Sequence, residues 1–269
     1  MKTRIISGVI MGLILIAVLT AGFLWNPIVI ITTVGLLAAA AVYELLHNAV
    51  GIEDKVSWIG ACVYAFLAVL SLQVGGYAML ALVCWFILTA VYTVFAVVLI
   101  LKNHKTFNLT HIFSLFALPI PYSLAFLSLG GIIISKSGIY YLLQLLNFSC
   151  ICDMGAYFVG VTLGKHKLCP EISPKKTVEG AVGGILSSIL ISVILCLCFN
   201  KNLIAGILLT VPFCVLSMIG DLFASTIKRA VGLKDYSNLI PGHGGIMDRL
   251  DSIIMISPLM YILTLFSVM

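Results

Sequence analysis

Three aspartates carry the clearest signal of chemistry in this sequence. Asp221 ends one long apolar run, and Asp248 and Asp251 open the next, in a chain of 269 residues with 10 acidic residues in all. Carboxylates held at the same depth repel each other unless a cation lies between them. Mg²⁺ accepts a few carboxylates together with water and phosphate oxygens, and a spacing of three places Asp248 and Asp251 on one helix face. The three aspartates therefore predict a divalent metal site.

Basic residues surround these aspartates and indicate what the metal would accompany. They are Lys228, Arg229, Lys234 and Arg249. Acids that hold a metal, together with bases that hold the phosphates left uncovered, suit a nucleoside triphosphate.

The glycine-rich segment PGHGG at 241–245 supplies a backbone that can approach a ligand closely. Its amides, including those of Gly244 and Gly245, are expected to donate hydrogen bonds to phosphate. The segment is not a Walker P-loop, which needs GxxxxGK[ST] after a strand. His243 has three interpretations: a phosphate donor, a solvated loop histidine or a metal ligand.

A second polar region begins at Asp153, inside an apolar run and about two turns from its end. A carboxylate there costs on the order of 2 to 3 kcal/mol on insertion scales, so it normally faces a cavity or a partner. The alternative is a carboxylate paired with a neighbouring lysine for packing alone.

The loop after Asp153 forms a cationic rim. Its lysines are Lys165, Lys167, Lys175 and Lys176. Pro170 and Pro174 stop helix propagation there and favour extended turns. The usual excess of basic residues on cytoplasmic loops would also account for these lysines without a ligand.

A helix is predicted to begin after Thr177, which suits the N-cap, with Glu179 in the first turn where it complements the helix dipole. The exposed amides at this helix start are expected to attract phosphate. Gly180 and Gly184 have small-xxx-small spacing, which favours helix packing over ligand contact.

Long apolar segments must position these polar residues. Hydrophobic residues make up 62% of the chain and charged residues 9%, with a mean hydropathy of +1.20. Soluble domains are roughly one quarter charged, and apolar runs of about 20 residues match the thickness of a bilayer core. The sequence therefore predicts an all-α polytopic membrane protein. About nine transmembrane helices are expected, near 5–24, 27–46, 57–73, 77–101, 111–131, 139–161, 180–199, 203–222 and 252–268.

The basic residues predict how these helices are oriented. With the N-terminus inside, thirteen of the 15 Lys and Arg residues are cytoplasmic, and Lys136 and Lys201 lie outside. We expect a multi-pass protein of the cell (plasma) membrane whose N-terminus and active-site loops face the cytoplasm. The first run shows no clear cleavage site and is expected to be retained. The net charge of +5 fits contact with anionic lipid headgroups and does not call for nucleic acid.

Most of the 8 cysteines fall inside expected spans, where a thiol packs as a small apolar group. No CxxC spacing predicts a zinc or redox site.

The acidic residues are distributed unequally along the chain. Seven of the 10 acids follow residue 150. Residues 1–150 are therefore expected to be mainly scaffold and lipid-facing, and residues 151–269 to carry the active site within one integral membrane unit.

The segment from Ser225 to Asp251 resembles the signature of the phosphatidate cytidylyltransferase (CDP-diacylglycerol synthase) family over 27 unbroken positions. The residues that carry this resemblance are S at 225, KR at 228–229, KD at 234–235, S at 237, P at 241, HGG at 243–245 and DRLD at 248–251. The segments DMGAYFVG at 153–160 and SPKKTVEG at 173–180 are also similar to that family's. One departure is Val161, where the family often has a basic residue.

The resemblance implies an all-helical membrane enzyme, often a homodimer, that converts CTP and phosphatidate to CDP-diacylglycerol and pyrophosphate. It also implies dependence on Mg²⁺, and the sequence leaves open whether a second cation joins it. The lipid phosphate is already an anionic nucleophile. Its attack on the α-phosphorus of CTP therefore needs alignment and charge neutralisation rather than a strong general base.

Roles for the residues follow from this resemblance. Asp221 and Asp248 are expected to bind the metal, and Asp251 to bind it or to support a ligand. The expected catalytic residues are Asp221, Lys228, Arg229, Asp248, Arg249 and Asp251. The expected substrate-binding residues are Asp153, Lys165, Lys167, Ser173, Lys175, Lys176, Thr177, Ser225, Lys234, His243, Gly244 and Gly245.

Other functions share parts of this pattern. A CTP-dependent lipid kinase, or a cytidylyltransferase for another lipid phosphate, would use the same metal and triphosphate chemistry. A kinase would release CDP, whereas a cytidylyltransferase releases pyrophosphate. A transporter would explain the intramembrane Asp153, but the sequence lacks paired broken helices in two repeated halves.

Overall fold

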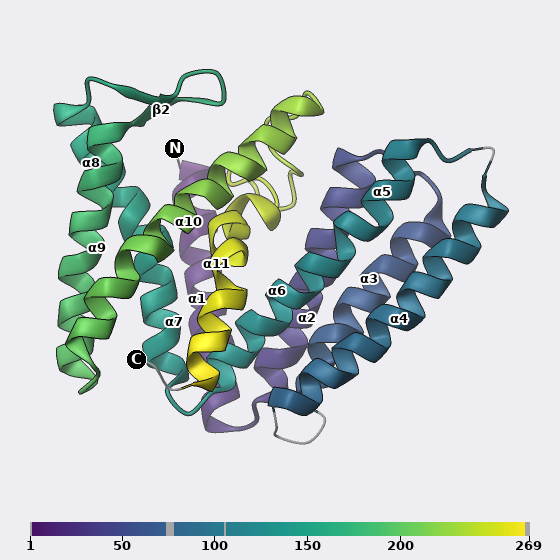
Figure 1. Cartoon of the computed structure of the whole chain (residues 1–269), viewed down its shortest axis with the longest axis horizontal. Helices are drawn as coiled ribbons and strands as arrows, with labels where there is room; N and C mark the ends of the chain where they lie inside the picture. Colours follow the sequence, from purple (N-terminus) through teal and green to yellow (C-terminus); the bar gives the residue numbers. More distant parts are fainter. Residues whose placement is uncertain (1, 74–77, 105, 267–269) are drawn as a thin grey trace. The chain divides into compact units, whose positions relative to one another are not determined.

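The computed structural model describes residues 2–73, 78–104 and 106–266, and helices dominate it (Figure 1). The first elements are α1 (Lys2–Leu24), α2 (Ile28–Tyr43), the π-helix η1 (Glu44–Ala49), α3 (Lys55–Leu70), the 3-10 turn η2 (Ser71–Gln73), α4 (Ala78–Lys102), α5 (Leu109–Ala117) and α6 (Pro119–Ile134). The later elements are α7 (Gly138–Leu146), the π-helix η3 (Asn147–Ile151), α8 (Cys152–Leu163), β1 (Lys167–Cys169), β2 (Ser173–Thr177), α9 (Val178–Cys198), α10 (Leu203–Ala230) and α11 (Met247–Leu265). The predicted all-α fold class is confirmed.

Helix lengths agree closely with the expected membrane spans. Within the described residues, eight helical segments are long and apolar enough to cross a membrane: Ile6–Leu24, Ile28–Ala49, Lys55–Gln73, Met79–Lys102, Leu109–Ile134, Gly138–Leu163, Val178–Cys198 and Leu203–Ala230. They correspond to the first eight expected spans. The largest difference in length is in α10, which continues past residue 222 to Ala230. The chain is therefore a multi-pass membrane protein.

The ninth expected span, 252–268, coincides with α11 over most of its length. This helix begins with the charged residues Asp248, Arg249 and Asp251, and it is not one of the eight apolar segments. Residues 267–268 of that span, residue 77 of the fourth and the predicted cytoplasmic Lys105 lie outside the described residues.

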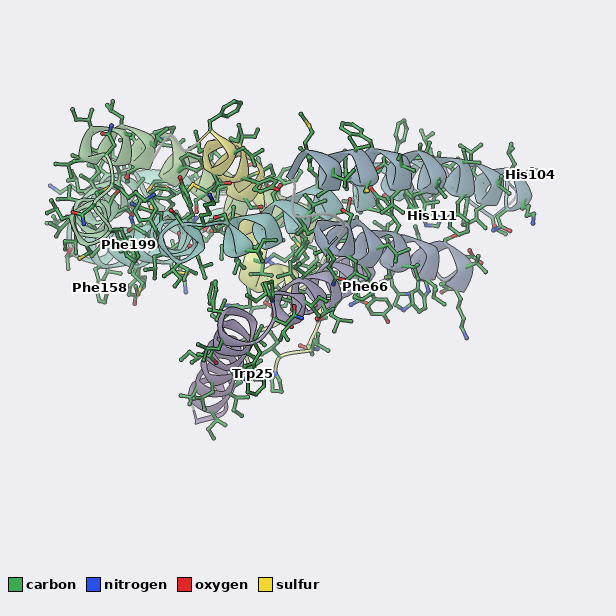
Figure 2. The ribbon with its side chains drawn as sticks, turned by 90° about the horizontal axis from the view of Figure 1, so that it is seen from below. Trp25, Phe66, His104, His111, Phe158 and Phe199 are labelled. Atoms are coloured by element: carbon green, nitrogen blue, oxygen red, sulfur yellow. The ribbon has the colours of Figure 1, made fainter. Side chains whose placement is uncertain are left out.

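Apolar side chains lie on the outer faces of the helices as well as between the helices. Trp25 is 86% exposed and Phe158 is 66% exposed, and Figure 2 shows both rings among the side chains that project from the ribbon. Such exposure is unfavourable in water, whereas in a bilayer the exposed apolar side chains of the spans face hydrocarbon. The surface thus agrees with the membrane spans.

The first of two compact units comprises Met1–Ile134 and Val231–Leu250. Within it α2, α3 and α6 pack against one another, with Ala41 and Ala65 fully buried. Tyr64 Oη lies 2.7 Å from Thr89 Oγ1 and accepts a hydrogen bond from Ser123 Oγ at 2.9 Å. Polar links of this kind join helices where lipid offers no hydrophobic driving force. This unit also holds the glycine-rich loop at 241–245.

The second compact unit comprises Ser135–Ala230 and Asp251–Met269. In it α8 and α9 pack closely along glycines (Figure 1). A Cβ atom on Gly180 would lie 2.6 Å from the carbonyl oxygen of Ala156, and one on Gly184 would lie 2.5 Å from that of Cys152. Only glycine allows this approach, so the predicted packing role of these two glycines is confirmed.

The loop between α8 and α9 forms a small antiparallel sheet rather than isolated extended turns. Strands β1 and β2 pair with Lys167 opposite Thr177, and Val178 N donates to the carbonyl oxygen of His166 at 2.9 Å. Pro170 and Pro174 exclude a helix here, as expected, but the pairing of the strands depends on contacts that composition does not reveal. The sheet holds β2 at the start of α9.

Several cysteines pack inside the helices, as the sequence predicts. All eight cysteines are free. Cys152, Cys196 and Cys214 are buried, where each thiol acts as a small apolar group.

Candidate active site

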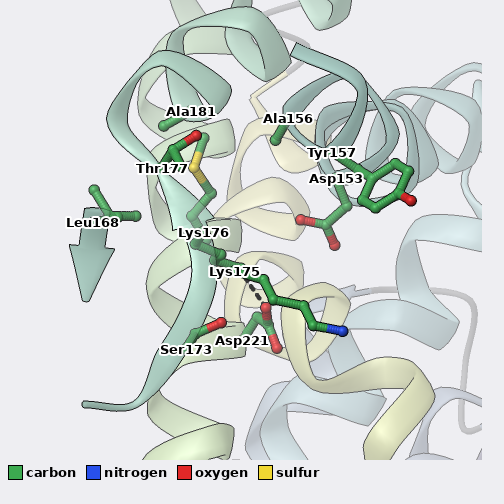
Figure 3. Close-up of a pocket in the computed structure, with 11 residues that line it drawn as sticks. Asp153, Ala156, Tyr157, Leu168, Ser173, Lys175, Lys176, Thr177, Ala181 and Asp221 are labelled. Atoms are coloured by element: carbon green, nitrogen blue, oxygen red, sulfur yellow. Dashed lines mark ion pairs between the residues drawn. The ribbon is translucent and has the colours of Figure 1, made fainter. Parts of the chain in front are cut away.

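A pocket of about 230 Å³ with several charged residues in its lining lies within the second unit. Three elements supply its polar lining, with Asp153 from α8, Lys175 and Lys176 from β2, and Asp221 from α10. Figure 3 shows these side chains around the pocket, with the carboxylate of Asp153 directed into the same space as Lys176 and Asp221. Residues from both polar regions of the sequence, 153–177 and 221 onward, therefore meet in one place.

An ion pair between Lys176 Nζ and Asp221 Oδ2 crosses this pocket (Figure 3). Both side chains are about three-quarters buried, with 24% and 28% of their areas exposed. Apart from this ion pair, Lys176 Nζ has no hydrogen-bond partner among the described residues. Asp153 lies close enough to interact electrostatically with both groups. The Lys176 ammonium therefore lies near two carboxylates and forms an ion pair with one of them.

Asp251 adds a further carboxylate to the same unit, just before the expected last span. Burial, followed by the negative charge of Asp221, raises the pKa of the Asp251 carboxyl to about 6, while Lys228 acts in the opposite direction. Asp251 Oδ1 accepts hydrogen bonds from the amide and hydroxyl of Ser252, at 2.7 and 3.2 Å. Asp221 and Asp251 are thus neighbouring acids of like charge.

The chemistry of these donors fits Mg²⁺. Carboxylate oxygens are hard ligands, and Mg²⁺ is commonly held by one or two carboxylates together with water and substrate phosphates. A cation between Asp221 and Asp251 would relieve the repulsion that raises the pKa of Asp251. Among the residues that the structure describes, no three His, Cys, Asp or Glu side chains form a complete metal cage.

The start of α9 partly corrects the expectation of free phosphate-binding amides. Thr177 is the N-cap, as predicted, because its Oγ1 accepts a hydrogen bond from Gly180 N at 3.1 Å. Val178 N already donates to His166. Two amides of the first turn are therefore occupied by the protein itself.

The Glu179 carboxylate binds the backbone of the loop that precedes α9. It also lies in the first turn of that helix, where its negative charge complements the helix dipole. Its Oε2 accepts hydrogen bonds from Lys165 N at 3.0 Å and His166 N at 3.2 Å. Its Oε1 lies 2.6 Å from His166 Nδ1. This carboxylate fixes the backbone that carries the cationic rim.

The remaining predicted residues of the second unit differ in exposure. Lys165, Lys167, Lys175 and Arg229 are exposed, whereas Ser173, Ser225 and Lys228 are partly buried. Lys175 and Ser173 both line the pocket, so the structure brings these two together with Asp153, Lys176, Thr177 and Asp221. The roles of all these residues stay predictions.

In the first unit, the glycine-rich loop folds into a tight turn. Ile240 N donates to the carbonyl oxygen of Gly244 at 2.9 Å, and Gly244 N donates back to that of Ile240 at 3.1 Å. Gly242 and Gly244 have φ angles of 79° and 86°, a region that other residues rarely adopt. The glycines are therefore required by the turn itself.

Asp248 accepts hydrogen bonds from the backbone around this turn. Its Oδ2 accepts from Tyr236 N at 2.8 Å and from Gly245 N at 2.9 Å. The amide of Gly245, which sequence analysis assigned to phosphate, is thus directed at a carboxylate. Asp248 therefore organises the loop, whatever it also binds.

His243, Lys234 and Arg249 complete this region. The ring of His243 lies against α1, with Nδ1 2.8 Å from Ser7 Oγ. Lys234 and Arg249 are exposed on the surface of the unit. The contact with Ser7 shows that His243 is not a purely solvated loop histidine.

Glu44 is a residue that sequence analysis did not assign to the site. It is 2% exposed and accepts hydrogen bonds from Ser237, Ile246 and Met247, all within the loop region of the first unit. One signal could have found it: an acidic residue inside an expected membrane span is costly and usually functional.

Comparison with known proteins identifies the class of this membrane protein. Residues 2–267 match the model of the cytidylyltransferase family. A phosphatidate cytidylyltransferase of Bacillus subtilis (strain 168) is 31% identical over 296 aligned positions, which cover 99% of both chains. The chain belongs to the cytidylyltransferase family.

Staphylococcal relatives are more similar over a shorter region. Phosphatidate cytidylyltransferases of Staphylococcus haemolyticus and Staphylococcus saprophyticus are each 40% identical, over 130 and 147 residues. These alignments cover 48% and 52% of this chain, and the chain spans about half the length of those relatives, 50% and 56%.

Proposed function

We propose that this protein is an enzyme that transfers the cytidylyl group of CTP to phosphatidate, giving CDP-diacylglycerol and pyrophosphate in phospholipid biosynthesis. The pocket in the second unit carries the proposal, because Asp153, Lys176 and Asp221 place two acids and a base within membrane-spanning segments or beside them. Family membership and the Bacillus relative support the same reaction. A site with these charges beside membrane-spanning segments suits the phosphate groups of a lipid and of a nucleotide.

The reaction requires positioning more than proton transfer. An oxygen of the phosphatidate phosphate forms a new bond to the α-phosphorus of CTP, while the bond from that phosphorus to the pyrophosphate oxygen breaks. Two anions must approach each other, so cationic side chains are the main requirement. Lys176 is buried at the pocket and Lys175 is exposed at its edge, which suits them to bind phosphate oxygens.

Mg²⁺ is the proposed cofactor, with Asp221 as the principal protein ligand and Asp248 and Asp251 as further candidates. When bound, the metal would neutralise phosphate charge and orient the triphosphate. Metal binding by Asp221 would weaken its ion pair with Lys176 and make the ammonium available for phosphate.

The orientation in the membrane and the assembly are also proposed. Lys165, Lys167, Lys175 and Lys176 lie around the same loop, and an excess of basic residues marks the cytoplasmic side of bacterial and eukaryotic membrane proteins. We place this loop and the N-terminus in the cytoplasm of a plasma-membrane protein, where CTP is available. A homodimer is proposed from the family resemblance.

The direct test incubates purified protein in detergent micelles with phosphatidate and CTP labelled at the α-phosphate, with and without Mg²⁺. We expect labelled CDP-lipid and an equal amount of pyrophosphate, only when metal is present. Release of CDP with label absent from the lipid would contradict the proposal and identify a CTP-dependent kinase or hydrolase. If labelled CDP-lipid forms when another lipid phosphate is added but not when phosphatidate is added, the enzyme is a cytidylyltransferase for that other lipid.

A further inference from the structure

The buried carboxylate of Glu44 binds the loop region on both sides of the glycine turn. Its Oε1 accepts hydrogen bonds from Ser237 Oγ at 2.6 Å and Ile246 N at 3.0 Å, and its Oε2 accepts from Met247 N at 2.9 Å. Glu44 belongs to η1, roughly 200 residues away in sequence but in the same compact unit. One side chain thus joins residues that precede and follow the turn.

The turn is shaped to receive this carboxylate. A Cβ atom on Gly245 would lie 2.5 Å from both Glu44 oxygens, so only glycine leaves room there. The amide of the same Gly245 donates to Asp248 Oδ2 at 2.9 Å. The backbone from Gly245 to Met247 is therefore held between two carboxylates, Glu44 and Asp248.

The bonded amides are those at the start of α11. The helix begins at Met247, and the first amides of a helix have no partner within it. Glu44 supplies that partner from another element, and its negative charge also complements the helix dipole. The first turn of α11 carries Asp248 and Arg249, two of the expected catalytic residues.

An apolar residue would be cheaper to bury at this position if packing were the only requirement. An acid inside an apolar segment costs free energy unless its hydrogen bonds and charge are needed. Glu44 lies within the candidate span Ile28–Ala49, and its exposed area is only 2%. Its bonds are directed wholly at the loop region and the start of α11.

We propose that Glu44 is a positioning residue, which sets the backbone of residues 236–247 and the first turn of α11 for binding the triphosphate. The role in triphosphate binding rests on the proposed function, whereas the positioning of the loop by Glu44 does not. Glu44 acts through the amides of Ile246 and Met247 and not by contact with a reacting atom.

The test uses Glu44→Gln in the full-length protein. Glutamine keeps one acceptor oxygen, but its amide nitrogen cannot accept the bond that Met247 N or Ile246 N donates. Glu53→Gln is the matched control, because Glu53 is an exposed glutamate of the same unit. Hydrogen exchange of peptides covering 236–250, and steady-state kinetics with varied CTP, are measured for both variants and the wild type.

We expect faster exchange at 236–250 in Glu44→Gln, with no change in peptides from 135–230, and a KM for CTP about 10-fold higher. Loss of folded enzyme would lower kcat alone, so a change in KM separates positioning from a purely structural role. Exchange at wild-type rates, or an unchanged KM for CTP, would overturn the proposal. Glu53→Gln should match the wild type in both measurements.

A second variant covers the case in which Glu44→Gln does not fold. Ser237→Ala removes one hydroxyl donor to Glu44 Oε1, together with the acceptor of Leu239 N at 3.2 Å, and leaves the two amide bonds to Glu44 in place. It should increase exchange at 236–250 and raise the KM for CTP about 3-fold, whereas wild-type values of both would overturn the proposal. If the wild type makes no CDP-lipid, the proposed function fails, and hydrogen exchange alone still decides whether Glu44 positions the loop.

Discussion

The carboxylates of the two units have different partners: a lysine side chain in the second unit, and mainly backbone amides in the first. Asp221 pairs with a lysine at a pocket that Asp153 also lines. Glu44 and Asp248 instead accept hydrogen bonds from backbone amides on both sides of one turn. An ion pair can be exchanged for a metal and a phosphate, whereas a carboxylate held by several amides is fixed in place.

This difference suggests a division of labour between the two units. The second unit offers charges to a ligand, and the first unit holds a loop in a defined conformation. Mutations of the pocket should therefore affect binding and catalysis with little change in local order. Mutations that remove an acceptor oxygen of the loop carboxylates should change local order as well.

The largest effect is expected for Asp221→Asn. The change removes the negative charge that pairs with Lys176 and is proposed to bind Mg²⁺, so activity should fall by about 1,000-fold, comparable to loss of a major transition-state contact. Initial rates of CDP-lipid formation measure this. A variant that is monodisperse by size exclusion and loses less than 10-fold would show that Asp221 is not the principal ligand.

Asp248 tests whether a carboxylate that holds the loop of the first unit also binds the metal. Asp248→Asn keeps an oxygen that can accept from Tyr236 N and Gly245 N but removes the charge. We expect activity to fall about 100-fold while hydrogen exchange of the loop stays normal, because metal binding needs the charge and the turn needs only an acceptor.

Asp248→Ala is the companion of that variant. It removes the acceptor as well, so exchange of the loop should also increase, and leaving buried amides unpaired should destabilise the loop by about 1 to 3 kcal/mol. Near-normal activity of Asp248→Asn would contradict the metal assignment and leave Asp248 with a role in the loop alone.

A smaller effect is expected for Lys176→Met. Methionine has a similar length and no charge, so the variant loses the phosphate contact and leaves Asp221 free for a metal. Activity should fall roughly 10-fold to 100-fold, mainly through weaker substrate binding. Steady-state kinetics with both substrates varied provide the measurement. A rise in activity would instead show that the ion pair with Asp221 is inhibitory.

The smallest effect is expected for Thr177→Ala at the start of α9. Loss of the hydroxyl that accepts from Gly180 N should lower stability by about 1 kcal/mol. Thermal unfolding in detergent should therefore shift by a few degrees, with a smaller loss of activity than in Lys176→Met. Thr177→Ser, which keeps the hydroxyl, is the control, and equal destabilisation of both variants would contradict the capping role.

The sequence was sufficient for the helices because each span is encoded locally. Apolar runs near 57–73 and 203–222 have the length that a bilayer requires, and the structure has helices there. Thr177 was also predictable, since an N-cap depends only on its own type and the residues that follow. Small-residue spacing likewise predicted the close approach at Gly180 and Gly184.

Contacts between distant parts of the chain could not be predicted in this way. Glu44 was one acid in an apolar run, and nothing near it in sequence points to Ile246 or Met247. The pairing of β1 with β2 and the use of Gly245 N by Asp248 depend on the folded backbone. A pattern of residue types shows which groups are present, but not which of them already have protein partners.

The most direct test of this division is the stabilisation of the protein by Mg²⁺ together with CTP. A ligand that binds the folded state raises the unfolding temperature, so thermal unfolding with CTP is compared in Mg²⁺ and in EDTA. We predict that the Mg²⁺-dependent rise persists in Glu44→Gln and disappears in Asp221→Asn. A rise of wild-type size in Asp221→Asn, or its complete loss in Glu44→Gln alone, would contradict the account.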